Sequence, residues 1–318
     1  MRYGKGSYGM NPFPFSDDNK RYHTLSYHNR HTYGKRIFKA VIDAGFTCPN
    51  IDGTRGLGGC IFCDGGSGYF TASSRLSVSE QYLLEEKRIR EKYPKAGIIA
   101  YFQAHSNTYC TSERLKALLS EAVSCGAEGI AIATRADCID GEKADIIASL
   151  PVPVTVELGL QTVSDETAAK INRCHSFAEF LEGYRLLKDR KIRVCVHIID
   201  GLPGEKRENM LETARALGRL RPDGVKIHLL HVIKGTRLCE MYESGEYTPL
   251  EKAEYIDTVI GQLELLPQET VIERITGDGD KKKLAAPLWS ADKISVLGGI
   301  DKRMAEIGTY QGRLFSVS

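Results

Sequence analysis

Six apolar, often β-branched runs alternate along most of the chain with segments of helical patterning. The runs are Ile37–Ile42, Gly97–Phe102, Gly129–Ala133, Val152–Leu158, Arg193–Ile199 and Val225–Val232. Nearly continuous apolar runs are typical of parallel strands that are buried on both faces, and the helices between them make the crossover connections. Because six units are too few to close an eight-stranded barrel, the alternation predicts an α/β fold in the form of a partial (β/α)6 barrel.

The alternation divides the chain into three parts. Helices are expected at Ser79–Tyr93, Ser112–Cys125, Glu142–Ser149, Ser164–Ile171, Phe177–Lys188 and Lys206–Leu220. Ser79, Ser112, Ser164 and Ser176 are suitable N-caps for four of them. Residues 1–35 show little periodicity and predict an irregular N-terminal arm, residues 36–240 form the β/α core, and residues 241–318 form a C-terminal extension. The extension is expected to hold one helix, Leu250–Leu266, and a loop-rich tail.

The composition is that of an ordinary globular protein from a reducing compartment. The 318 residues contain no run of about 18 apolar residues and no apolar stretch at the N-terminus, so we expect neither a membrane span nor a secretory signal. Nine cysteines, an odd number, argue against a disulfide scaffold and for a cytoplasmic location. A net charge of +2 neither demands nor excludes a nucleic-acid partner, because a basic face can lie within a balanced total.

Three cysteines lie close together in the stretch CPNIDGTRGLGGCIFC: Cys48, Cys60 and Cys63. Iron–sulfur clusters are normally held by four cysteines, so three thiolates would leave one iron of a four-iron cluster open to a small molecule. The surrounding glycines, which include Gly53, Gly56, Gly58, Gly59, Gly65, Gly66 and Gly68, allow the backbone to wrap closely around a bulky group. A Cys2His2 zinc site with His28 and His31 is an alternative, although it leaves Cys48 without a role.

The cysteine loop resembles that of the radical S-adenosylmethionine (SAM) superfamily, in the branch that includes the Elongator catalytic subunit. Eleven residues separate the first two cysteines, where the usual superfamily motif has three, and this long gap is typical of the branch. Further matches are TRADC (134–138, with Ala136 in place of a proline), VELGLQT (156–162), INRCHS (171–176) and IDGLPGE (199–205). FQxxxNTY (102–109) and HxLHxxxGT (228–236) resemble a smaller bacterial subgroup of about this length. The acetyltransferase domain of the Elongator subunit is absent, so acetyl transfer is not implied.

The resemblance implies a [4Fe-4S] cluster held by Cys48, Cys60 and Cys63, with SAM bound to the open iron through its amino and carboxylate groups. Reduction of the cluster would cleave SAM and release a 5′-deoxyadenosyl radical, while the protein supplies binding and orientation. The residues expected to contact SAM are Phe62, Gln103, Asn107, Glu157, Gln161, Arg173 and His197. All are expected near the carboxyl ends of strands, where α/β sheets bind ligands.

Several of these residues have plainer interpretations. Glu157 is expected at a strand end, where it could accept hydrogen bonds from SAM or be an ordinary solvent-facing acid. Arg173 suits a carboxylate or the end of a helix. Arg135 and Asp137 could form a structural ion pair. The strand histidines include His228 and His231, which a straight strand would place on opposite faces, so at most one of the two is expected to face the interior.

The substrate and partners follow mainly from the resemblance. The Elongator subunit acts on the wobble uridine of tRNA, and the smaller subgroup is linked to the aminomethyl-type side chain at the same position. Basic and aromatic residues that could bind RNA interleave in the arm: Arg2, Tyr3, Lys5, Tyr8, Phe13, Phe15, Lys20, Arg21, Tyr22, Tyr27, Arg30, Tyr33, Lys35 and Arg36. A solvated arm that packs across the barrel is the alternative. The cluster needs an electron donor such as flavodoxin or ferredoxin. Other possible functions are radical chemistry on a small metabolite or tetrapyrrole, and a non-catalytic iron–sulfur or zinc module that binds RNA.

Overall fold

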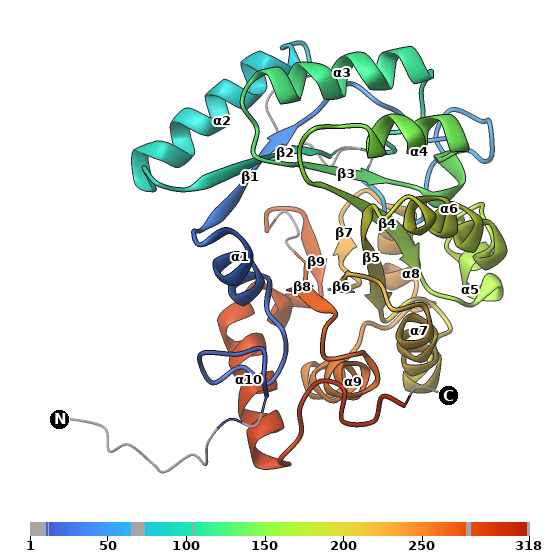
Figure 1. The fold of residues 1–318 in the computed structure, drawn as a ribbon. Helices are drawn as coiled ribbons and strands as arrows, with labels where there is room; N and C mark the ends of the chain where they lie inside the picture. The colour runs from blue at the N-terminus through green and yellow to red at the C-terminus, as the bar shows by residue number, and fades with distance from the viewer. Residues whose placement is uncertain (1–10, 12, 65–73, 104, 278–280, 317–318) are drawn as a thin grey trace.

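Seven parallel strands form one curled sheet that makes a partial barrel (Figure 1). The computed structural model describes residues 11, 13–64, 74–103, 105–277 and 281–316. In spatial order the strands are β1 (Ile37–Ile42), β2 (Gly97–Phe102), β3 (Ile130–Thr134), β4 (Val154–Gln161), β5 (Arg193–Asp200), β6 (Gly224–Leu229) and β8 (Val271–Ile275). The six predicted strands and the partial barrel are confirmed, and β8 adds a seventh strand.

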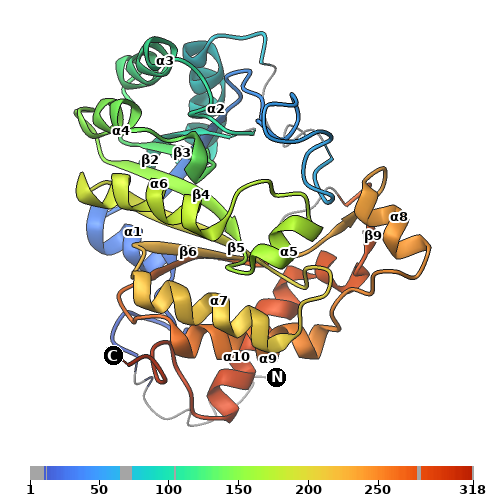
Figure 2. The same ribbon diagram turned by 90° about the vertical axis from the view of Figure 1, so that its right-hand side faces the viewer.

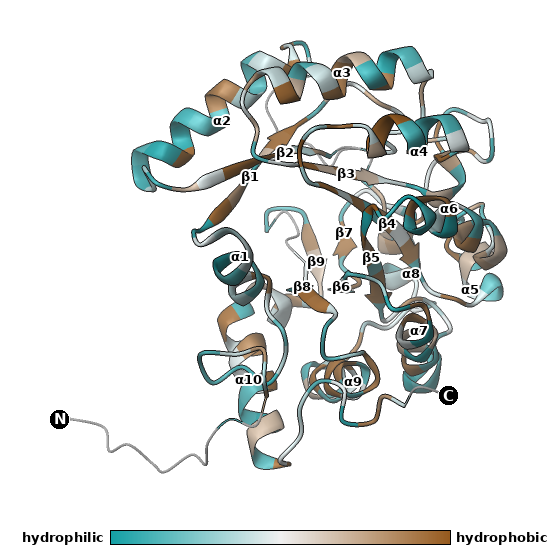
Figure 3. Cartoon of the chain, viewed as in Figure 1, coloured by the Kyte–Doolittle hydropathy of each residue, from teal (hydrophilic) through white to brown (hydrophobic). Residues whose placement is uncertain are grey.

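Helices follow the first five strands and cover the convex face of the sheet (Figure 2). They are α2 (Val78–Lys92), α3 (Ser112–Ser124), α4 (Gly141–Ala148), α5 (Asp165–Lys170), α6 (Phe177–Asp189) and α7 (Arg207–Leu220), with the short 3-10 helix η2 (Ala136–Cys138) before α4. Ile98, Ile132 and Val196 are fully buried in the core on the strands' helix-facing side. The strands are accordingly hydrophobic, whereas the helices are polar on their outer sides (Figure 3).

Alternation along each strand decides which residues reach the inside of the barrel. In β4, Val156, Leu158 and Leu160 are fully buried and belong to the helix-facing core. Successive side chains of a strand point to opposite faces, so Glu157 and Gly159 lie on the concave side. The concave face of the sheet is therefore the place where polar residues of the strands can meet.

The C-terminal part of the chain is more regular than its sequence suggests. It contains β7 (Val232–Ile233), α8 (Arg237–Glu243), α9 (Lys252–Leu265), β9 (Leu284–Ala286), η3 (Leu288–Ala291) and α10 (Lys293–Glu306). The predicted helix is confirmed as α9, and β7 pairs antiparallel with β9. The prediction of a loop-rich tail is wrong, since the tail holds β8, β9 and α10. β8 is difficult to recognise in the sequence because it is only five residues long and carries Glu273 and Arg274 among its apolar residues.

The N-terminal arm is partly helical, which corrects the expectation of an irregular segment. Helix α1 (Leu25–Tyr33) has no buried residue, so it lacks the apolar stripe that makes a helix recognisable. Thr24 forms a parallel bridge with Ile272 of β8. Phe13 and Tyr22 are buried, as the packed-arm alternative requires, and are therefore not available for stacking on a base.

Some predictions lie outside the described residues. These concern Arg2, Tyr3, Lys5 and Tyr8 of the arm, and Gly65, Gly66 and Gly68 of the glycine-rich loop. Among the helices that the structure describes, none is long and apolar enough to cross a membrane.

Candidate active site

Cys48, Cys60 and Cys63 lie in the loop that follows β1, at the carboxyl end of the sheet. The amide of Cys63 donates to the carbonyl of Cys60 at 2.9 Å, and the amide of Gly59 donates to Asn50 at 2.9 Å. Gly59 has a φ of 76°, a conformation that glycine adopts without strain. Asn50 is fully buried, and its Nδ2 lies 3.7 Å from the Cys60 Sγ. The loop thus has a fixed local structure around the thiols.

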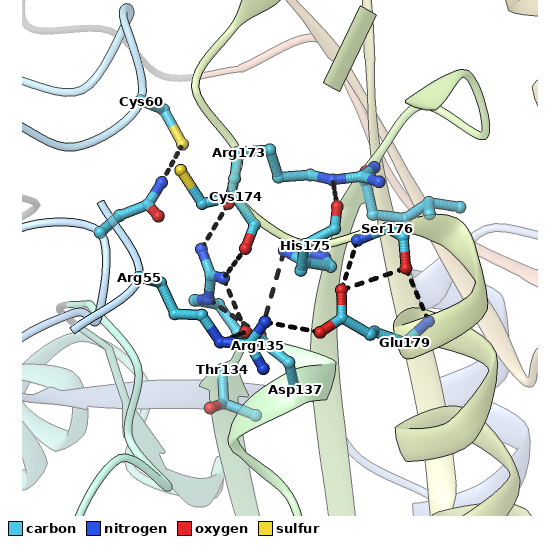
Figure 4. Close-up of polar contacts among 12 residues, drawn as sticks. Arg55, Cys60, Thr134, Arg135, Asp137, Arg173, Cys174, His175, Ser176 and Glu179 are labelled. Carbon is cyan, nitrogen blue, oxygen red and sulfur yellow. Dashed lines mark hydrogen bonds and ion pairs between the residues drawn. The ribbon is translucent and has the colours of Figure 1, made fainter. Parts of the chain in front are cut away.

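The turn after α5 supports this loop, and Figure 4 shows Cys174 of that turn beside Cys60. The amide of Ile61 donates to the carbonyl of Ile171 at 3.1 Å. Asn172 Nδ2 donates to the carbonyl of Gly59 at 2.7 Å, and the side chain of Asn50 donates to the carbonyl of Asn172. Asn172 and Cys174 both have positive φ, 54° and 58°, which is uncommon outside glycine. The INRCHS segment is therefore shaped to hold the cysteine loop.

Arg135 and Asp137 form a bidentate ion pair beside the thiols (Figure 4). Arg135 Nε lies 2.9 Å from Asp137 Oδ1, and Nη2 lies 2.7 Å from Oδ2. Arg135 Nη1 also donates to the carbonyl of Arg173 at 2.7 Å. The structural ion pair proposed from the sequence is thus present, and it links η2 to the turn below the cysteine loop.

The three thiols are close enough to influence one another's ionisation. Burial, followed by the charges of Cys63 and Cys48, raises the pKa of the Cys60 thiol to about 12, whereas Arg135 acts in the opposite direction. Metal ligation needs the thiolate. The positive charge of Arg135 and the amide donor of Asn50 would stabilise that form, so the chemistry of the donor set suits a [4Fe-4S] cluster. The ligand assignment itself stays a prediction.

The zinc alternative is contradicted by the placement of its histidines. His28 lies on α1 and lines a cavity with Arg193 and Val271, at the amino ends of β5 and β8. Cys60 lies beyond the carboxyl end of β1, at the opposite end of the barrel. Within the described residues, no group of three or more His, Cys, Asp or Glu residues is arranged to hold a metal ion, and this includes the three cysteines of the loop.

The remaining predicted SAM contacts mostly surround the carboxyl end of the sheet. Phe62 is half-buried in the cysteine loop, and Gln103 directly follows β2, where its amide donates to Ile42 at 3.0 Å. Asn107 is buried, and its Nδ2 donates to the carbonyl of Ala133 at 2.8 Å. Gln161 ends β4 at a register shift, and its buried Oε1 has no hydrogen-bond partner. The structure therefore brings these four residues to one edge, and their contacts with SAM stay predictions.

Arg173 is almost fully enclosed, with 1% of its surface exposed. Its Nε donates to the carbonyl of His175 at 3.0 Å, and its Nη1 donates to the carbonyls of Leu160 and Thr162. Burial lowers its pKa to about 10. Two of these contacts fix the end of β4, and Nη2 makes no hydrogen bond within the described residues but lies 3.5 Å from Asp165. Any contact with a SAM carboxylate would have to use Nη2.

Glu157 is not at a strand end and does not face solvent, which corrects its predicted position and the solvent-facing interpretation, whereas its contact with SAM stays a prediction. β4 continues to Gln161, so Glu157 lies four residues inside the barrel with 1% of its surface exposed. Its Oε1 lies 2.5 Å from Lys39 Nζ, and its Oε2 lies 2.5 Å from Lys226 Nζ. The two lysines hold the pKa of Glu157 well below its usual range against the opposing effect of burial.

Two further residues complete the arrangement around Glu157. The hydroxyl of Tyr101 donates to Glu157 Oε2 at 2.7 Å, and His197 Nε2 lies 3.0 Å from the same oxygen. We call this set the interior network; its members are Lys39, Tyr101, Glu157, His197 and Lys226. His197 was predicted to bind the cofactor, and that contact stays a prediction, but the structure places the ring within this network.

The interior network was largely missed in the sequence. Lys39 lies in the run IFKAVI and Lys226 in GVKIHL. A single charge inside an otherwise apolar strand is the signal that could have identified both residues, because charged side chains are rarely buried without a partner.

His228 and His231 approach the same residue, contrary to the expectation of opposite faces. A Cβ placed on Gly277 would lie 3.6 Å from the His228 ring and 3.5 Å from the His231 ring. β6 ends at Leu229, so strand alternation does not extend to His231. The Nε2 atoms of both rings are buried without a hydrogen-bond partner.

Comparisons with known proteins identify the family. The model of the Radical SAM superfamily matches residues 50–217, and that of the Radical_SAM C-terminal domain matches residues 222–306. The uncharacterised protein YtqA of Bacillus subtilis is 44% identical over 309 residues, which cover 96% of each chain. A tRNA uridine(34) acetyltransferase of Methanocaldococcus jannaschii is 34% identical over 153 residues, 47% of this chain and 28% of that protein.

The fold agrees with these matches. The archaeal Methanocaldococcus infernus Elp3 structure superposes with a TM-score of 0.67 at 19% identity, covering 87% of this chain and 64% of that chain. With a matching family model over more than half of its length and a close full-length relative, the chain belongs to the radical SAM superfamily, in its Elongator-like branch.

Proposed function

We propose that this radical SAM enzyme modifies the wobble uridine of tRNA, acting on an aminomethyl-type side chain at C5 of the base. The observation that carries the proposal is the 34% identity over 153 residues to a chain named tRNA uridine(34) acetyltransferase. The cysteine loop and the polar barrel interior supply a site for radical chemistry on such a group. A carboxymethylaminomethyl side chain would present a C–H bond beside nitrogen to an abstracting radical.

Cys48, Cys60 and Cys63 would hold a [4Fe-4S] cluster, which together with SAM supplies a 5′-deoxyadenosyl radical that removes a hydrogen atom from the substrate. The chain's own residues hold the thiols in place: Asn172 fixes the loop, and Arg135 compensates thiolate charge. The concave interior keeps the reacting atoms away from bulk water, which limits side reactions of a reactive intermediate.

The substrate base would have to leave its stack to reach this site. Bases in single-stranded loops can be splayed out without breaking a duplex, so an anticodon base suits a site at the mouth of a barrel. We further propose that a flavodoxin or ferredoxin reduces the cluster and that the reaction takes place in the cytoplasm.

Mass spectrometry of tRNA nucleosides from a deletion strain tests the proposal. We expect the strain to accumulate the unprocessed wobble-uridine side chain, and a plasmid-borne copy to restore the normal profile. A copy with Cys60→Ala should not restore it. An unchanged nucleoside profile in the deletion strain would refute the tRNA substrate and direct attention to a small metabolite.

A further inference from the structure

The interior network joins strands that are far apart in the sheet. Its members come from β1, β2, β4, β5 and β6. Lys39 of β1 also lies 3.8 Å from Glu273 of β8, although β1 and β8 are the two edges of the sheet. Only side chains on the concave face can bridge such distances, so the network occupies the inside of the barrel.

The network lies inside the barrel, below the edge of the sheet that carries the cysteine loop. Glu157 is in register with Cys195 of β5 and lies four residues before the end of β4. At about 3.3 Å per residue, this places it roughly 13 Å inside the carboxyl edge that carries the cysteine loop. The acid group of a carboxymethylaminomethyl side chain would therefore reach the lysines only when the base itself enters the barrel.

The charges of this region do not cancel. Lys39, Lys226 and Arg193 are positive, whereas Glu157 and Glu273 are negative, so this set, in which the side chains of Lys39 and Arg193 are 26% and 25% exposed, has an excess of positive charge. His197 and His228 do not change this balance, because burial lowers the pKa of both rings. Arg274 lies in register with Lys226, and its positive charge also acts on Tyr101 and His228, so it adds to the positive excess of this region.

An unbalanced buried charge is unfavourable, and a bound anion would relieve it. Lys226 is 5% exposed, and it shares the Glu157 carboxylate with Lys39. A carboxylate of the substrate would reduce this positive excess. His228 Nε2, which is buried without a partner, offers an additional polar contact, since the His228 ring lies 5.2 Å from that of His197.

We propose that Lys226 and Lys39 form a binding site for a carboxylate of the substrate inside the barrel. This inference rests on the proposed function, because the carboxylate would be that of a carboxymethylaminomethyl group on the wobble uridine. Lys226 would then select substrates that carry the acid over those that carry only the aminomethyl group.

Binding of two matched tRNAs to the cluster-loaded enzyme tests the site. One tRNA carries carboxymethylaminomethyluridine at the wobble position, and the other carries aminomethyluridine in the same sequence, so their phosphate contacts are the same. We expect the wild type to bind the acid form about tenfold more tightly, which corresponds to about 1.4 kcal/mol. Lys226→Met should reduce the ratio to about one, whereas Glu157→Gln, which adds one positive charge, should increase it.

The opposite changes in the binding ratio distinguish loss of carboxylate recognition from structural damage, because structural damage would lower the affinity of both variants for both tRNAs. Equal binding of the two tRNAs by the wild type would overturn the proposal without any variant. A Lys226→Met enzyme that retains the ratio but loses affinity for labelled SAM in equilibrium dialysis would overturn it as well, by assigning the carboxylate to SAM. The deletion-strain nucleosides report on the proposed function separately, so equal binding with an altered nucleoside profile refutes the carboxylate site alone.

Discussion

Cys60 illustrates how one residue of the cysteine loop depends on its surroundings. Burial raises the pKa of its thiol to about 12, so the thiol is protonated at neutral pH until iron displaces the proton. The nearby Asn50 and Arg135 favour the thiolate but do not outweigh burial. The protonated Cys60 thiol is therefore a poor nucleophile in the metal-free chain.

Replacing Cys60 by alanine should abolish cluster binding after anaerobic reconstitution, because only two thiol ligands would remain. Cys174→Ala is the matched control, since Cys174 lies against Gly56 of the same loop but is not a predicted ligand. Iron and sulfide content measure the outcome. A Cys60→Ala protein with full iron content, or a Cys174→Ala protein without iron, would contradict the assignment of ligands.

Asp200 gives the protein a titratable group outside the cofactor site. Burial raises the pKa of this carboxyl from 3.8 to about 7. Oδ1 accepts a hydrogen bond from Gln262 Nε2 at 2.7 Å, and Oδ2 has no partner among the described residues. The folded state thus prefers the protonated acid. Its contribution to stability is fully present below the unfolded pKa of 3.8 and is lost as the pH rises through 7.

The Asp200→Asn variant, which mimics the neutral acid, should therefore become more stable relative to the wild type as the pH rises from 4 to 7. A shift of this size corresponds to at most about 4 kcal/mol. Urea denaturation across this pH range measures the difference between the two proteins, which removes the contributions of other carboxyls. A difference that is constant with pH would show that Asp200 has an ordinary pKa in the folded protein.

At the scale of elements, helices and strands with an apolar pattern can be predicted from the sequence, whereas elements without such a pattern cannot. The six strands of the core are continuous apolar runs, and Ser164 and Ser176 cap their helices as predicted. Ser77 and Thr111, instead of Ser79 and Ser112, cap α2 and α3, because adjacent hydroxyl residues offer equivalent caps. β8 and α1 are held by tertiary contacts, which local pattern does not encode.

The residues of the candidate site also differ in how well the sequence predicts them. The cysteine loop and the strand-end residues are recognisable from motifs, but the interior network depends on which strands lie opposite one another. Glu157 was recognised as important, yet its partners Lys39 and Lys226 are separated from it by 118 and 69 residues. Curvature of the sheet, which no local pattern specifies, brings them together.

Helix α6 approaches η2 so closely that only glycine fits at position 183. A Cβ on Gly183 would lie 2.3 Å from the carbonyl oxygen of Ala136, which belongs to the segment that carries Arg135 and Asp137. Gly183→Ala should therefore destabilise the protein by about 1–3 kcal/mol, although alanine favours a helix by about 1 kcal/mol.

Gly298→Ala in α10 is the matched control for this substitution, because nothing lies within 4 Å of the added Cβ. It should increase stability by up to about 1 kcal/mol. Thermal or urea unfolding of the two variants gives the comparison. Equal and positive effects of both substitutions would show that α6 and η2 can separate without cost.

At the scale of the whole molecule, the sheet stays open between β1 and β8, and side chains cross the gap in place of backbone hydrogen bonds. Lys39 lies 3.8 Å from Glu273, and Glu273 lies 2.6 Å from Arg193 of β5. Gly224 leaves room for this pair, since a Cβ there would lie 2.8 Å from Glu273 and 3.2 Å from Arg193. Helix α1 contacts β8 at the same opening.

These ion pairs across the opening predict that Glu273→Gln destabilises the protein by up to about 3 kcal/mol, because it leaves the half-buried Arg193 without its carboxylate. Hydrogen exchange should accelerate first in β8 and α1, the elements at the opening. Glu166→Gln, which breaks an exposed pair with Lys170, should cost at most about 0.5 kcal/mol. Adding Arg193→Met to Glu273→Gln should restore part of the loss, since both buried charges are then removed. If β8 exchanged no faster in Glu273→Gln than in the wild type, the ion pairs would not be what holds the edges of the barrel together.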